Sequence, residues 1–165
     1  MPSTAAAARR LQDRAVLWSI GDIHATDVVT AACDALVAGL DSPALRILAA
    51  CTRAEADHDV PDLLPPALGE LGLTFYAVGS AAAQEAAVRA LALRMRAGEL
   101  TPRELASRIH RRFGHELPLA ERLAEFDDEY DLLELEHGDR TPAQLDADVR
   151  AEALRLLFSG LPGVR

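Results

Sequence analysis

The sequence TPRELASRIHRRFG, residues 101–114, carries the signals that begin and end one amphipathic helix. The Thr101 hydroxyl can cap the first turn, Pro102 suits the first helical position, and Glu104 can bond back to the start. Gly114 can adopt the left-handed backbone conformation that commonly ends a helix. The predicted apolar face consists of Leu105, Ala106, Ile109 and Phe113, with charged side chains opposite.

The same punctuation predicts helices on both sides of this stretch. Thr141, Pro142 and Gln144 open a helix over 142–158, which Gly160 should end. Upstream, Ser80 caps a helix over 81–97 that ends near Gly98. The leucine and aromatic spacing of residues 118–134 predicts a helix between these two.

The first half of the chain contains further helix signals and several breakers. We expect a helix over 26–39 and a short one from Pro43, capped by Ser42. Thr52 and Glu55 resemble a capping box that restarts the chain after a bend. Pro61, Pro65 and Pro66 predict an interruption, because interior prolines remove a backbone donor and clash with the preceding turn. Only a short helix should then run to about Leu71.

Composition agrees with a helical fold. The chain contains 32 alanines and 26 leucines, which favour helix, and only seven aromatic residues, which favour strand. Residues 73–78 are strand-like, but they lack a clear partner and are predicted to be an extended connector. We therefore predict an all-α protein, a single-domain irregular bundle of about seven helices. Residues 1–24 should form an N-terminal segment, partly flexible, and residues 25–165 the helical domain.

The formal net charge of −9 disfavours binding to nucleic acids and to anionic membrane surfaces, which repel an acidic protein. All 17 basic residues are arginine, a bias typical of a high-GC bacterium. We find no convincing signal peptide and no apolar run long enough to span a membrane, and we expect a cytoplasmic protein. Cys33 and Cys51 lie among apolar neighbours and are predicted to be buried thiols.

Gly21-Asp22-Ile23-His24 resembles the first metal-binding motif of calcineurin-like phosphoesterases. That family is strand-rich and needs further ligands, including an asparagine, whereas this chain contains no asparagine. We therefore interpret the motif as a loop that caps the following helix.

The other histidines also give no recognisable site. Asp57, His58 and Asp59 match no standard metal-binding spacing and are interpreted as a polar loop. His110, His115 and His137 are interpreted as isolated. We predict no catalytic residue, cofactor or metal from the sequence.

Charge is strongly segregated along the second half of the chain. Residues 84–112 carry seven arginines against three acidic residues, a net of +4. Residues 113–152 carry thirteen acidic residues against three arginines, a net of −10. The simplest interpretation is pairing between neighbouring helices. A DNA-binding role for Arg108, Arg111 and Arg112 is disfavoured, because a strongly acidic segment of the chain follows directly and would repel the phosphate backbone.

A helical wheel of residues 119–135 places two leucines outside the apolar face. Leu132 and Leu135 fall on the acidic face with Glu121, Glu125 and Asp128. Either the helix breaks near Asp131, which we favour, or the two leucines stand exposed among carboxylates.

From these features we expect a non-enzymatic protein-interaction or regulatory module whose acidic surface binds a basic partner, or which associates with itself. The tentative partner-binding residues are Glu121, Glu125, Asp128, Leu132 and Leu135. The alternative is a small-molecule-binding protein or an enzyme with a cleft between helices.

Overall fold

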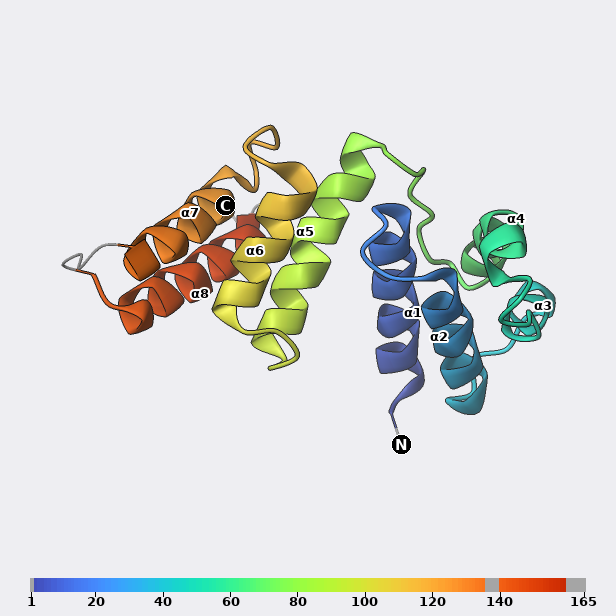
Figure 1. Ribbon diagram of the computed structural model, residues 1–165. Coiled ribbons are helices and arrows are strands. Elements are labelled where there is room, and N and C mark those ends of the chain that lie inside the picture. Colours follow the sequence, from blue (N-terminus) through green and yellow to red (C-terminus); the bar gives the residue numbers. More distant parts are fainter. Residues whose placement is uncertain (1, 136–139, 160–165) are drawn as a thin grey trace. The chain divides into compact units, whose positions relative to one another are not determined.

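The computed structural model describes residues 2–135 and 140–159. These residues form eight α-helices and no strand, which confirms the prediction of an all-α bundle of about seven helices (Figure 1). The helices are α1 (Thr4–Ser19), α2 (Ala25–Val37), α3 (Pro43–Ala49), α4 (Ala56–Glu70), α5 (Ala81–Arg96), α6 (Pro102–Phe113), α7 (Glu121–Leu135) and α8 (Pro142–Ser159). No helix among the described residues combines the length and the apolar character needed to cross a membrane.

Internal contacts divide the chain into two compact units, Met1–Ala87 and Val88–Arg165. Unit 1 contains α1 to α4 and unit 2 contains α6 to α8, while α5 extends across the boundary. Residues 1–24, which we predicted as a separate N-terminal segment, include α1. This helix packs against α2 and buries Leu11 and Leu17 completely.

The core of unit 1 is built largely from small side chains. Ser3 caps α1 by accepting a hydrogen bond from the Ala6 amide, and Ser42 caps α3 through the Leu45 amide. Eight of the fifteen buried residues in the core cluster are alanine, and Ala32 and Ala35 are fully buried. Small residues at these positions let the helix backbones approach closely.

Helix α4 corrects two predictions. It runs unbroken through Pro61, Pro65 and Pro66, so the predicted interruption is wrong. The segment 57–59, predicted as a polar loop, forms its first turns. Pro61 and Pro66 are exposed and Pro65 is half-buried, so the carbonyls left without an amide partner can bind water. The opposite face buries Val60, Leu64, Ala67 and Leu68, and this burial offsets the missing hydrogen bonds.

The connector between α4 and α5 is extended, as predicted. Residues 73–77 are neither helix nor strand. The Gln12 side chain on α1 makes two hydrogen bonds to the backbone of this connector. The Thr74 amide donates to Gln12 Oε1 at 2.7 Å, and Gln12 Nε2 donates to the Thr74 carbonyl at 2.6 Å. One glutamine thereby satisfies the backbone donor and acceptor of a residue 62 positions away.

Unit 2 confirms the predicted starts of α6 and α8, whereas α7 begins at Glu121, three residues after the predicted start. Thr101 and Glu104 form the reciprocal capping box of α6, with bonds of 2.7 and 3.1 Å. Thr141 and Gln144 form the equivalent pair at α8. Gly114 ends α6 with φ 56°, whereas the predicted stop at Gly160 lies outside the described residues. The largest fully buried side chains here are Leu91, Leu105, Ile109, Leu123, Leu145 and Leu156.

Candidate functional site

The five predicted partner-binding residues lie along one line of α7. Glu121, Glu125, Asp128, Leu132 and Leu135 are spaced alternately by four and three positions, which places them on a single stripe of a helix. We call these five residues the α7 stripe. The opposite face of α7 buries Leu123, Ala124, Phe126 and Tyr130 in unit 2.

Helix α7 continues to Leu135, so the predicted break near Asp131 is wrong. Leu132 and Leu135 are instead exposed, with 55% and 80% of their surface accessible. Arg103 on α6 holds this end of the helix, because its guanidinium pairs with Asp131 at 3.6 Å and with Glu134 at 2.6 Å. Two ion pairs on successive turns stabilise a helix end that the leucines alone would not order.

Part of the charge on α7 is compensated within unit 2. Arg122 pairs with Glu125 at 2.8 Å and Glu129 at 3.1 Å, and its guanidinium lies 4.0 Å from the centre of the Phe126 ring. Arg140 pairs with Glu129 and Asp148. The Arg122 pairs lie within α7, whereas the Arg103 pairs join α6 to α7 and support the interpretation that neighbouring helices pair their charges. Helix α7 nevertheless carries seven acidic residues and one arginine, a net of −6, so its surface remains acidic.

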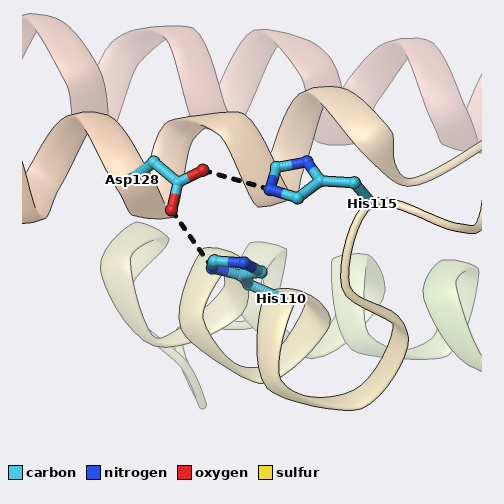
Figure 2. Close-up of side chains that lie close together, drawn as sticks. All are labelled: His110, His115 and Asp128. Carbon is cyan, nitrogen blue, oxygen red and sulfur yellow. Dashed lines mark ion pairs between the residues drawn. The ribbon is translucent and has the colours of Figure 1, made fainter.

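Two histidines that we had interpreted as isolated lie together with Asp128 (Figure 2). His110 Nδ1 lies 3.6 Å from Asp128 Oδ1, and His115 Nε2 lies 3.1 Å from Asp128 Oδ2. The two rings meet edge to face with centroids 5.0 Å apart. His110 Nδ1 also lies 2.9 Å from Asp127 Oδ2. Two imidazole nitrogens thus converge on one carboxylate.

The local fold explains this convergence. His110 lies in the last turn of α6, and the Gly114 amide donates to the His110 carbonyl at 2.8 Å. The positive φ of Gly114 ends the helix and places His115 beside that turn. Packing of α7 against α6 then brings Asp127 and Asp128 to the same end. His110 and Asp127 are partly buried, whereas His115 and Asp128 are about half exposed.

A second cluster lies in unit 1 at the start of α4. Ligand atoms of Cys51, Glu55 and Asp59 lie within 4.8 Å of one another. Burial raises the pKa of the Cys51 thiol, and the carboxylates of Asp59 and Glu55 raise it further. The protein therefore disfavours the thiolate, which is the form that binds metals and attacks electrophiles.

The structure also corrects the prediction for the cysteines. Cys33 is exposed and Cys51 is half-buried. Cys33 falls beside, and not on, the buried stripe of α2, and its thiol donates to the Ala49 carbonyl at 3.4 Å. Neither thiol is therefore fully enclosed by the core.

The Gly21-Asp22-Ile23-His24 motif precedes α2 as a loop and cap. His24 is the N-cap residue of α2, and its amide donates to Asp27 Oδ2 at 3.0 Å. A metal site of the phosphoesterase type requires strand ends, and the described part of the chain has no strand. The resemblance is therefore confined to four residues. His137 lies outside the described residues.

Each unit contains a pocket or cleft that a small ligand could enter. In unit 2, a cleft of about 270 Å³ is lined by Met95, Arg96, Arg150 and Leu154 from α5 and α8. In unit 1, a smaller pocket of about 140 Å³ lies between α2 and the start of α4 and includes Cys51 and Arg53. Among the described residues that line these two sites there is no histidine and no carboxylate.

Only a weak signal in the sequence pointed to the histidine cluster. His110 and His115 are five residues apart with a helix-ending glycine between them, a spacing that permits convergence without requiring it. Comparisons with protein-family models, with curated proteins and with solved structures found no match to this chain.

Proposed function

We propose that this protein is a non-enzymatic interaction module that binds a basic amphipathic helix of a partner protein along the α7 stripe. The observation that carries the proposal is the exposure of Leu132 and Leu135 on a helix with a net charge of −6. Of the fourteen leucines described in unit 2, only four are exposed, and Leu132 and Leu135 lie one turn apart, where they form an apolar contact point with an acidic surround.

The leucines and the acidic residues of the stripe would contribute differently to binding, the leucines to affinity and the acids to the association rate. Burying a leucine side chain against a partner contributes roughly 1.5–3 kcal/mol, so Leu132 and Leu135 would provide most of the affinity. Glu121, Glu125 and Asp128 would attract and orient a basic partner, which mainly raises the association rate. Both contributions suit a helix that presents apolar residues at one end and arginine or lysine along the rest.

Self-association through the same stripe is disfavoured by charge. Two copies of α7 in contact would bring together two surfaces that each carry a net charge of −6. The resulting repulsion weakens only at high ionic strength. A dimer formed through Leu132 would therefore become tighter as salt is added, whereas a complex with a basic partner would become weaker.

The test compares three forms of the full chain as bait in a lysate of a high-GC bacterium. Leu132→Glu replaces the first leucine of the stripe, and Leu93→Glu makes the same change on α5, where the leucine is also exposed. We expect the wild type and Leu93→Glu to retain the same basic protein, and Leu132→Glu to lose it. The purified pair should then bind at least about tenfold more weakly with Leu132→Glu, a loss of about 1.4 kcal/mol.

Three results would contradict the proposal. They are an acidic partner, equal binding by Leu132→Glu, or a salt-strengthened dimer of the wild type that Leu132→Glu dissolves. Melting temperatures of all three forms accompany the assay, because substitutions at exposed positions should leave stability nearly unchanged. A large fall for Leu132→Glu would show that the leucine belongs to the core.

A second candidate function rests on the cleft between α5 and α8. Its lining of Arg96 and Arg150 with Met95 and Leu154 suits a small ligand that has a carboxylate and an apolar tail. A thermal-shift screen of short-chain carboxylates tests this function. Stabilisation of the wild type that disappears in Arg150→Met would support it, and absence of any shift would remove it.

A further inference from the structure

We infer that His110, His115 and Asp128 form a binding site for a divalent transition-metal ion of the zinc type. Their ligand atoms lie within 4.8 Å of one another, in a part of unit 2 built by the end of α6 and the middle of α7. Figure 2 shows both imidazole rings directed at the two oxygens of the one carboxylate. The site shares Asp128 with the α7 stripe but does not include Leu132 or Leu135, on which the proposed function depends.

The geometry is close to what zinc requires. Zinc binds imidazole nitrogen and carboxylate oxygen at roughly 2.0–2.2 Å, so neighbouring ligand atoms of a tetrahedral site lie about 3.3–3.5 Å apart. The nitrogen-to-oxygen separations here are 3.6 and 3.1 Å. The side chains of His115 and Asp128 are about half exposed, which leaves them free to move by the small remaining distance.

Two further contacts favour a metal over a plain set of ion pairs. The two imidazole rings have centroids 5.0 Å apart, close enough for their nitrogens to share one cation with the Asp128 carboxylate. Asp127 lies against His110 Nδ1 at 2.9 Å and is the less exposed of the two carboxylates. The same nitrogen faces Asp128, so an ion bound to it would replace this hydrogen bond, and the Asp127 carboxylate can then become the fourth ligand.

The chemistry of the ligands selects the class of metal. Imidazole suits zinc, copper, nickel and cobalt, whereas calcium and magnesium prefer six or more oxygen ligands. Two nitrogens and one or two carboxylate oxygens therefore favour the first group. The exposure of His115 and Asp128 predicts moderate affinity and exchange of the ion with solvent.

The test uses the full chain without an affinity tag, because a histidine tag would itself bind the metal. The background carries Cys51→Ala, which removes the competing cluster in unit 1. Zinc affinity is measured by competition with a chromophoric chelator, and cobalt binding by its visible absorption bands. We expect one ion per chain and cobalt bands typical of nitrogen and oxygen ligands in a tetrahedral field.

Variants assign the ligands. His110→Ala, His115→Ala and Asp128→Asn should each weaken zinc binding by more than about tenfold, and Asp127→Asn by about tenfold. His58→Ala, an exposed histidine on α4, and Asp131→Asn, an acidic residue of α7 outside the cluster, are matched controls that should change nothing. Leu132→Ala, which removes the apolar contact without adding a carboxylate one turn from Asp128, should leave zinc binding intact, so failure of the proposed function and failure of this site are distinguishable.

Two results would overturn the inference. The first is a wild-type affinity no higher than that of the His110→Ala, His115→Ala double variant. The second is equal loss in the control variants, which would show diffuse binding to the acidic surface. If a variant fails to fold, its circular dichroism will show it, and the imidazole resonances of the wild type under zinc titration then decide, since only the ligating rings should shift.

Discussion

The Tyr130 hydroxyl donates a hydrogen bond of 2.5 Å to a carboxylate oxygen of Asp146 and thereby joins α7 to α8. The tyrosine is buried, with 4% of its surface accessible. Burial raises the pKa of Tyr130 well above its ordinary value, and the bond to Asp146 raises it further, so the hydroxyl remains a donor. This contact holds the back of α7 while the α7 stripe faces outward.

Replacing Tyr130 by phenylalanine tests how strongly this contact stabilises unit 2. The change removes the hydroxyl, keeps the buried ring and leaves Asp146 with partial access to water. We expect the free energy of unfolding to fall by about 1–2 kcal/mol, as measured by urea denaturation. Tyr76→Phe, on the connector, is the control. An equal effect from both substitutions would mean that the bond to Asp146 adds no stability.

The capping box of α6 predicts a specific response to acid. The pKa of Glu104 is lowered because the Thr101 amide and hydroxyl interact with its carboxylate. The stabilisation is therefore complete above the ordinary pKa of glutamate and is lost as the pH falls through the lower folded-state value. Glu104→Gln, which cannot titrate, should show less loss of stability between neutral pH and about pH 3. Glu116→Gln is the control, and parallel curves for wild type and Glu104→Gln would contradict the prediction.

The pairing of Gln12 with Thr74 makes a prediction for unit 1. Gln12→Ala removes both hydrogen bonds to the connector and should lower stability by about 1–2 kcal/mol. The Thr74 amide should then exchange its proton with solvent markedly faster, since it loses its acceptor. Gln12→Glu keeps an acceptor for the Thr74 amide but loses the donor. An effect between wild type and Gln12→Ala is expected, and unchanged exchange in both variants would argue against the pairing.

Helix α4 contains a position where a substitution should raise the free energy of unfolding. Pro66→Ala restores a backbone donor in the helix interior at an exposed position. Because an interior proline costs a helix about 3 kcal/mol, and alanine adds only up to about 1 kcal/mol of unfolded-chain entropy, we expect a net gain of about 1–2 kcal/mol. Pro43→Ala, at the first position of α3 where proline fits, should lower stability slightly. Thermal and urea denaturation measure both, and a loss in Pro66→Ala would show that the ring itself is needed.

The helix starts were predictable because they depend on a few neighbouring residues. Ser42, Ser80, Thr101 and Thr141 each accept a hydrogen bond from the first turn of the helix that follows. Such bonds need no information from distant parts of the chain. The placement of α3, α5, α6 and α8 therefore followed from local sequence.

The errors arose where distant contacts override local preference. The prolines of α4 argue for a break, but burial of the opposite face keeps the helix intact. Leu132 and Leu135 argued for a break near Asp131, but Arg103 from another helix pairs with Asp131 and the helix stays continuous. His110, His115 and Asp128 meet only because α6 and α7 pack together, and neither helix sequence specifies that register.

The alanine-rich core of unit 1 sets unequal limits on how its sequence can change over evolutionary time. Ala32 and Ala35 are fully enclosed, so a larger side chain at either position would force the surrounding helices apart. Leu45 and Leu64, in contrast, can exchange with methionine or isoleucine of similar volume at small cost. Sequences that keep this arrangement should therefore retain small residues along α2 even where the leucines of α3 and α4 have drifted.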